Sequence, residues 1–166
     1  MLKNMKENVK NWRDENELKE YLKKLLTKKA YDKSGLIYGI GHAVYTLSDP
    51  RAKLLRDYAR TLAYEAGREK EYEFFTLIEK LSPEVFHEVK QNDKVVCANV
   101  DFYSGFVYDL LGIPESLFTP LFAAARISGW SAHRMEELVS GGRIMRPAYK
   151  CVQKRRKFIP VAQRGE

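Results

Sequence analysis

The sequence has few cysteines and no long apolar run. Cys97 and Cys151 are its only cysteines, too few for a disulfide framework and without the paired spacing of a zinc site. No segment approaches the roughly 18 consecutive apolar residues of a membrane-spanning helix. The first residues also lack the apolar core of a signal peptide. These absences predict a soluble chain in a reducing cytoplasm, without a bound metal or a membrane partner.

The central part of the chain lacks a basic surplus, although the net charge is +7. Residues 1–34 have ten lysines and arginines against six acids, and residues 150–166 have six against one. Residues 35–149 are left with a net charge of −2. Basic ends are ordinarily a solvated helix face and a tail. The distribution therefore argues against a nucleic-acid partner.

What the sequence does have is helical periodicity and 45% hydrophobic residues, enough for a core. Its length fits one domain, or one domain plus an arm. Asp49-Pro50 and Ser82-Pro83 each supply a cap and a first-turn proline. The pattern predicts an all-α fold. Apolar residues at intervals of three and four place helices over residues 2–12, about 17 to about 30, 50–66, 69–81, 83–89 and 102–111.

The longest helical pattern runs over residues 115–139 and is apolar around most of its circumference. Such a helix should be largely buried, and its small residues permit close packing against another helix, including one of a second subunit. Arg126 lies in its middle. A buried arginine needs a protein carboxylate or an anionic ligand, and the sequence leaves both open. An irregular arm that contains Arg146 follows the helix.

Asp101 stands where an apolar segment ends and an amphipathic helix begins. Spacing alone favours a helix N-cap. The alternative is a general base, which needs a hydrogen-bond donor and cations matched to an anionic substrate nearby. His42, Arg51, Arg126 and Arg146 are the candidates. Arg51, in the first turn of its predicted helix, is either an exposed side chain or a ligand for an anion that the helix N-terminus also attracts.

The helical period fails between residues 34 and 49, where Gly35, Gly39 and Gly41 precede His42. Glycines let a backbone approach a ligand closely. The Gly-Ile-Gly pair is a weak phosphate-binding pattern, because the third glycine of a dinucleotide fingerprint is missing. His42 is either a loop histidine with satisfied hydrogen bonds or a neutral imidazole whose fixed tautomer donates to a carbonyl.

Five motifs in this order resemble the C-terminal part of citrate synthase: Gly-Ile-Gly-His-Ala-Val-Tyr, Asp-Pro-Arg-Ala-Lys, Asn-Val-Asp-Phe-Tyr-Ser-Gly, Phe-Thr-Pro-Leu-Phe-Ala-Ala-Ala-Arg-Ile-Ser-Gly-Trp and Arg-Pro. The resemblance covers about residues 35–149. It implies an almost entirely α-helical protein, with N-terminal helices over residues 1–34 and a small helical domain over 35–113. Residues 114–166 would form a long buried helix of the large domain and an extended arm.

The resemblance also implies an acyltransferase that condenses acetyl-CoA with oxaloacetate and hydrolyses citryl-CoA, with no cofactor beyond the CoA thioester substrate. Asp101 would remove a methyl proton from the thioester, and His42 would donate to the oxaloacetate carbonyl. Arg51 and Arg126 would hold oxaloacetate carboxylates, and Arg146 would come from the second subunit of a homodimer. A glycine-punctuated loop would receive the CoA adenine: Leu36, Ile37, Tyr38, Gly39, Ile40 and Gly41.

Two features depart from the family pattern. The family's other catalytic histidine lies in an upstream His-Gly-Gly-Ala context, and neither His87 nor His133 is followed by glycines. Thr46 and Leu47 stand where relatives often carry basic residues, which weakens the expectation of CoA phosphate contacts. The chain is therefore expected to begin just downstream of that histidine motif and to have little or no synthase activity alone.

Two alternatives stay open at the level of sequence. The enzyme 2-methylcitrate synthase shares these motifs, so propionyl-CoA is an alternative acyl donor. The second alternative is a non-catalytic module that keeps the helical scaffold and serves for binding or dimerisation.

Overall fold

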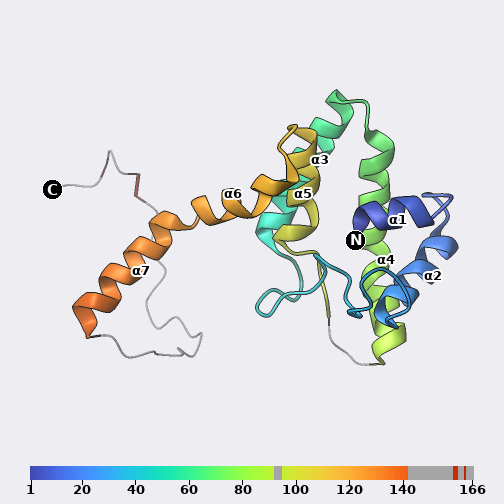
Figure 1. The fold of residues 1–166 in the computed structure, drawn as a ribbon, viewed down its shortest axis with the longest axis horizontal. Coiled ribbons are helices and arrows are strands. Elements are labelled where there is room, and N and C mark those ends of the chain that lie inside the picture. Colours follow the sequence, from blue (N-terminus) through green and yellow to red (C-terminus); the bar gives the residue numbers. More distant parts are fainter. Residues whose placement is uncertain (92–94, 142–158, 161–162, 164–166) are drawn as a thin grey trace. The chain divides into compact units, whose positions relative to one another are not determined.

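The computed structural model describes residues 1–91, 95–141, 159–160 and 163, and none of these lies in a strand. The all-α prediction is confirmed (Figure 1). The chain divides into two compact units, Met1–Ala124 and Ala125–Glu166. The second unit contains α7 (Ile127–Ser140). The first contains α1 (Leu2–Asn8), α2 (Glu15–Leu26), α3 (Pro50–Glu65), α4 (Glu69–Lys90), α5 (Val100–Leu110), the 3₁₀ helix η1 (Glu115–Leu117) and α6 (Phe118–Ala124).

The core of the first unit lies where α2 packs on α4 and where α3 packs on α5 and α4. The helices α2, α4 and α5 bury most of the apolar stripe that their periodicity predicts, whereas α3 buries only its alanines Ala52, Ala59 and Ala63. A fully buried leucine or phenylalanine stabilises the fold by about 1.5–3 kcal/mol, so these stripes hold the helices together. The larger buried side chains of α2 and α4 are Leu18, Leu22, Leu25, Phe74, Phe75, Ile78, Leu81 and Val85.

An aromatic cluster fixes α5 against α4. Phe75 of α4 stacks on Phe106 with ring centroids 4.4 Å apart, and meets Phe102 edge-on at 5.8 Å. Phe102 and Tyr103 are buried almost completely, and the Tyr103 hydroxyl donates to Glu79 at 2.6 Å. Such aromatic pairs add about 0.5–1.5 kcal/mol to the gain from burial. The cluster therefore sets the position of the α5 N-terminus, where Asp101 lies.

The loop before α3 crosses the start of α5 at very short range. Ile40 and Ala98 form an isolated antiparallel bridge, with hydrogen bonds from Gly41 N–H to Cys97 C=O (2.7 Å) and from Asn99 N–H to Gly39 C=O (2.8 Å). Gly39 has φ +86°, and a Cβ there would lie 2.7 Å from the Phe102 Cα. Only glycine permits this approach.

The helix boundaries at proline differ from the prediction. The sequence predicts separate helices over residues 69–81 and 83–89, but α4 is continuous across Pro83. Ser82 does not cap a new helix; its hydroxyl donates to the Ile78 carbonyl at 2.6 Å. A proline inside a helix removes one backbone hydrogen bond. Leu81 and Val85 are buried on either side of it, and this packing keeps the helix whole.

Residues 115–139 also differ from the prediction of one long, buried helix. They form η1 and α6, a turn at Ala125-Arg126, and α7. No α7 residue is buried within this chain. The apolar circumference predicts burial, but the described part of the second unit contains no core that could cover it. Arg126 is exposed at the N-cap of α7 rather than buried in mid-helix, and Arg146 of the predicted arm lies outside the described residues.

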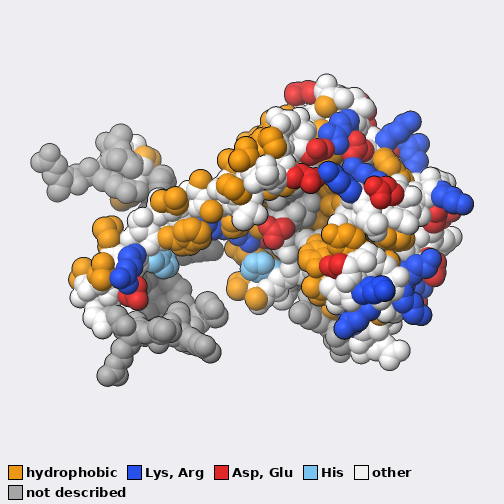
Figure 2. All heavy atoms as spheres, viewed as in Figure 1, with side chains coloured by type: hydrophobic (Ala, Val, Ile, Leu, Met, Phe, Trp, Pro, Cys, Tyr) orange, Lys and Arg blue, Asp and Glu red, His pale blue; other side chains and the backbone are white. Residues whose placement is uncertain are grey.

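The lysines of α2 face the acidic residues of α4. Lys19 pairs with Glu84 at 2.7 Å, and Lys23 pairs with Glu88 at 2.8 Å. Exposed pairs of this kind stabilise by about 0–1 kcal/mol. These ion pairs nevertheless neutralise part of the positive charge of residues 1–34. Basic and acidic side chains are intermixed on the face of the first unit drawn in Figure 2.

A less exposed charge network joins α1, α4 and α5. Glu71, whose side chain is 19% exposed, forms an ion pair with Lys6 and accepts from Arg68 Nε at 2.6 Å. Arg68 also donates to Asp109 at 2.7 Å. The hydrogen bond from Arg68 is the main cause that lowers the pKa of Glu71 from 4.5 to about 2, while burial acts in the opposite direction.

Replacing Glu71 with glutamine should lower the free energy of unfolding by about 1–3 kcal/mol at neutral pH, because Lys6 and Arg68 lose the carboxylate between them. The folded-state pKa is lowered to about 2. The stabilisation is therefore present above about pH 4.5 and is lost as the pH falls toward 2. Urea denaturation of the two proteins at a series of pH values measures this loss.

The matched control is Glu73→Gln, since Glu73 pairs with Arg13 at exposed positions and should change stability by less than about 1 kcal/mol. A difference between the chain and its Glu71→Gln variant that stays constant down to about pH 2.5 would contradict the assignment.

Replacing Gly39 with alanine should lower the free energy of unfolding by about 2–5 kcal/mol. The positive φ costs about 1–2 kcal/mol, and the clash with the Phe102 backbone forces a shift that costs about 1–3 kcal/mol more. Gly67→Ala is the control, because Gly67 has φ +66° and nothing within 4 Å of an added Cβ. Chemical denaturation should show a larger loss of unfolding free energy for Gly39→Ala than for Gly67→Ala. Equal losses would show that the loop does not contact α5 closely at residue 39.

Candidate functional site

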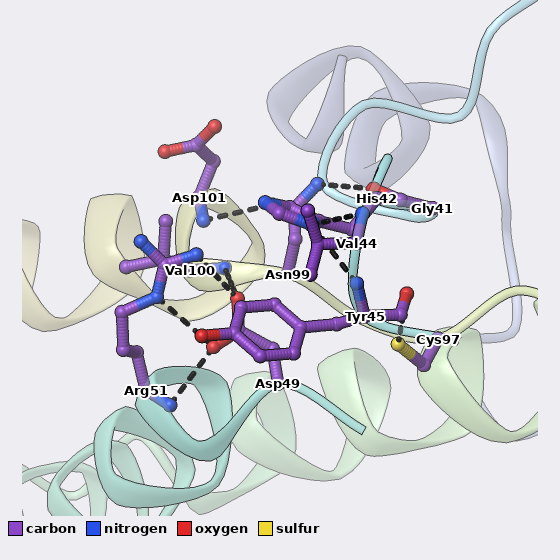
Figure 3. Close-up of polar contacts among 10 residues, drawn as sticks. All are labelled: Gly41, His42, Val44, Tyr45, Asp49, Arg51, Cys97, Asn99, Val100 and Asp101. Atoms are coloured by element: carbon purple, nitrogen blue, oxygen red, sulfur yellow. Dashed lines mark hydrogen bonds and ion pairs between the residues drawn. The ribbon is translucent and has the colours of Figure 1, made fainter. Parts of the chain in front are cut away.

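A polar cluster lies where three segments of the first unit meet (Figure 3). The segments are the loop before α3, the N-terminus of α3 and the N-terminus of α5. Backbone bonds of the Ile40–Ala98 bridge hold the first and third together. The residues that form the cluster are Gly41, His42, Val44, Tyr45, Asp49, Arg51, Cys97, Asn99, Val100 and Asp101.

The His42 imidazole is held in one orientation by its own loop. Its Nδ1 accepts hydrogen bonds from the N–H of Val44 at 3.0 Å and of Tyr45 at 3.1 Å. A nitrogen that accepts two N–H donors carries no proton, so the neutral ring has its proton on Nε2. The ring is partly exposed. This tautomer can donate one hydrogen bond outward, as polarisation of a carbonyl requires.

Asp49 joins the start of α3 to the start of α5. It is 1% exposed and accepts from the backbone N–H of Arg51 (2.9 Å) and Val100 (3.2 Å). It also accepts from Arg51 Nε at 3.0 Å and from an Arg51 terminal nitrogen at 2.8 Å. The Arg51 side chain is the main cause that lowers the pKa of Asp49, against the effect of burial. A buried carboxylate needs such a partner to remain charged.

Arg51 therefore already has a carboxylate partner within the protein. A guanidinium has five N–H donors, and the pair with Asp49 uses one on Nε and one on a terminal nitrogen. Its side chain is 37% exposed. The remaining N–H donors of Arg51 suffice to bind one further carboxylate. Because Asp49 fixes the orientation of the guanidinium group, it also fixes the direction in which these donors point.

Tyr45 lies between His42 and Arg51, and the sequence reasoning missed it. Its ring centroid is 4.8 Å from that of His42 and 5.5 Å from the Arg51 guanidinium carbon. The Cys97 thiol donates to the Tyr45 carbonyl at 3.6 Å, and burial is the main cause that raises the pKa of that thiol. Tyr45 is the last residue of the Gly-Ile-Gly-His-Ala-Val-Tyr motif, but the motif alone gave it no role.

Asp101 is not the cap of α5, so the N-cap prediction is wrong. Asn99 is the N-cap, and its side-chain oxygen accepts from the Asp101 N–H at 2.9 Å. The Asp101 carboxylate is exposed and points away from the Asp49–Arg51 pair in Figure 3. It lines a cavity of about 470 Å³ together with Met1, Tyr31, Phe102, Gly105 and Phe118.

The predicted CoA loop divides into inward and outward residues. Ile37 is 5% exposed and belongs to the core, whereas Leu36 and Tyr38 expose 55% and 46%. The Tyr38 hydroxyl donates to Asp32 at 2.6 Å. Gly39, Ile40 and Gly41 form the crossing with the segment before α5.

The predicted site residues are not all brought together by the structure. His42, Arg51 and Asp101 share the cluster of Figure 3. Arg126 belongs to the second unit, and Arg146 lies outside the described residues. Within the described ranges, no three His, Cys, Asp or Glu residues are grouped so that they could hold a metal ion. No helix among the same residues has both the length and the apolar character to cross a membrane.

Comparison with known proteins identifies the family of the chain. Residues 1–148 match the model for the C-terminal domain of citrate synthase. The chain is 42% identical over 129 residues to citrate synthase from Synechocystis sp., an alignment that covers 77% of this chain and 31% of that protein. It is 38% identical over 129 residues to 2-methylcitrate synthase from Shewanella oneidensis, with 77% and 32% covered.

The fold agrees with a solved citrate synthase structure. This structure is the ternary complex of Thermoplasma acidophilum citrate synthase with carboxymethyl coenzyme A and oxaloacetate, at a TM-score of 0.65 and 28% identity. The match covers 98% of this chain and 40% of that one. The alignments to the Synechocystis and Shewanella relatives span 31% and 32% of those proteins. The chain belongs to the citrate synthase family and corresponds to its C-terminal domain.

Proposed function

We propose that this chain is the C-terminal part of a citrate synthase-type enzyme that condenses acetyl-CoA with oxaloacetate to citrate and CoA. The observation that carries the proposal is the arrangement of His42 and Asp101. A histidine with its proton on Nε2 and an exposed carboxylate stand on two segments that the Asn99 side chain links. A base and a hydrogen-bond donor held by one scaffold are what this carbon–carbon bond formation requires.

In this proposal Asp101 removes a proton from the methyl group of the thioester, and negative charge develops on the thioester oxygen. The resulting enolate attacks the oxaloacetate carbonyl carbon. His42 gives its Nε2 proton to the carbonyl oxygen, which becomes the hydroxyl of citryl-CoA, and water then cleaves the thioester to release citrate and CoA. The cavity lined by Asp101 offers a place for the acyl group beside its base.

Oxaloacetate is a dianion, and the proposal assigns arginines to its carboxylates. Arg51 binds with the donors that its pair with Asp49 leaves unused, since guanidinium groups bind carboxylates in a bidentate manner. Arg126 and Arg146 complete the set, with Arg146 acting in the second subunit of a homodimer. The loop from Leu36 to Gly41 receives the CoA adenine, where Leu36 and Tyr38 expose apolar surface.

The enol side of the reaction needs a second donor. The 166 residues contain no His-Gly-Gly sequence, and His87 and His133 are followed by other residues. We infer that turnover needs a histidine from the N-terminal part of a citrate synthase, and that this chain alone has little activity.

Mixing this chain with a separately produced N-terminal half of a citrate synthase should produce turnover that neither part shows alone. Release of free CoA thiol from acetyl-CoA in the presence of oxaloacetate measures it. Asp101→Asn in this chain should reduce the rate by at least about a hundredfold, because the base is lost. Robust turnover by this chain alone would contradict the requirement for a second histidine.

Two alternative functions can be tested with the same proteins. Propionyl-CoA is a candidate donor because one relative is a 2-methylcitrate synthase, and the thiol assay with both thioesters compares them. A non-catalytic binding module is the second alternative, because the chain spans only about a third of the relatives' length.

Calorimetry with oxaloacetate should show millimolar or tighter binding by this chain, weakened at least about tenfold in the Arg126→Ala variant. Arg126 is exposed, so the substitution should leave the fold intact. The control is Arg134→Ala, since Arg134 lies within α7, whose N-cap is Arg126, and pairs with Glu137 at 2.7 Å. Absence of binding by the unmodified chain favours the scaffold alternative, and equal binding by Arg126→Ala removes that arginine from the site.

A further inference from the structure

The Asn99 side chain bonds to the backbone on both sides of the candidate site. Its amide nitrogen donates to the Gly41 carbonyl at 2.8 Å, and its oxygen accepts from the Asp101 N–H at 2.9 Å. We propose that Asn99 is a positioning residue that sets the place of His42 relative to Asp101. The proposal rests on the proposed function for its catalytic meaning, but its structural content can be tested separately.

The contact with Gly41 controls the peptide that leads into His42. The Gly41 carbonyl and the His42 nitrogen belong to the same planar peptide group, so a bond to this oxygen orients the His42 backbone. Gly41 has φ +97°, and the nearest atom to an added Cβ is 3.9 Å away. The space on the Cβ side of this glycine is therefore open, and two hydrogen bonds restrain its two peptide groups. They are the bond to Asn99 and the bridge bond to Cys97.

The second contact, with the Asp101 N–H, fixes the start of α5. Asn99 caps α5, and its side-chain oxygen fixes the first helical turn, where Asp101 lies. The backbone N–H of Asn99 also donates to the Gly39 carbonyl at 2.8 Å. One residue thus bonds to the loop at Gly39 and Gly41 and to the first turn of α5 at Asp101 and Phe102, whose N–H donates to the Asn99 carbonyl at 3.1 Å.

The chemistry of the side chain explains why asparagine stands at this position. The position needs a donor and an acceptor a few ångströms apart on one short side chain. Aspartate is an equally good helix cap, but it has only acceptors and would place a negative oxygen against the Gly41 carbonyl. Serine and threonine cap with one oxygen and lack the second group. A cap alone would not require the amide.

The decisive variant is Asn99→Asp, which keeps the cap and loses the bond to Gly41. It should unfold within about 2–4 °C of the unmodified chain. The backbone order parameters of residues 41–45, measured by NMR relaxation on this chain alone, should fall from the rigid range of about 0.85 toward about 0.6. The N–H of Asp101 should remain protected from hydrogen exchange.

Asp14→Ala is the matched control, because Asp14 caps α2 by accepting from Asn16 and Glu17. It should lower the melting temperature by about 2–4 °C and leave the order of residues 41–45 unchanged. In the two-part assay, Asn99→Asp should lower kcat by roughly tenfold to a hundredfold with little change in KM for oxaloacetate. Asp14→Ala should leave both constants unchanged.

The outcomes separate the two proposals. Unchanged order of residues 41–45 in Asn99→Asp would overturn the positioning role, whatever the activity. Loss of order without turnover by the unmodified two-part enzyme would keep the positioning role and contradict the proposed function. Loss of order with unchanged kcat would show that this position does not serve catalysis and would overturn the proposal.

Discussion

The candidate site depends on one short antiparallel contact between residues 39–41 and residues 97–99. Two backbone hydrogen bonds and the Asn99 side chain form it. It exists because residue 39 is a glycine, since any Cβ would meet the Phe102 backbone at 2.7 Å. The aromatic cluster under α5 fixes one side of the contact, and the chain on the other side leads directly into His42. Without this crossing, the loop and α5 would be separate elements.

Asp49 adds the second connection, from α5 to α3. A buried carboxylate is costly unless it is paired and hydrogen-bonded, and Asp49 meets this requirement with Arg51 and Val100. The same pair orients Arg51 and leaves some of its donors for an anion. The backbone around His42 fixes the tautomer of the imidazole in a similar way. Asp49, Arg51 and His42 are thus oriented by hydrogen bonds within the protein itself.

The sequence was sufficient for α2, α3, α5 and the family, but not for the extent of α4 and α7 or for the contacts between segments. Periodicity reports which face of a helix is apolar, so α2, α3 and α5 were predicted well. Pro83 was misread because the burial of its neighbours overrides the local penalty. Asp101 was misread because Asn99 caps equally well and also bonds to Gly41. Asp49, Tyr45 and Asn99 acquire their roles through partners that no local pattern identifies.

In the proposed function, His42 and Asp101 act on the same bound molecules and are held in place by the crossing before α5. The most direct measurement is a crystal structure of this chain, together with an N-terminal half, grown with oxaloacetate and a non-reactive acetyl-CoA analogue. We expect His42 Nε2 within about 3 Å of the oxaloacetate carbonyl oxygen and the Asp101 carboxylate beside the acyl carbon. Ligands bound away from the two residues, or His42 with Nε2 turned from the carbonyl, would contradict the account.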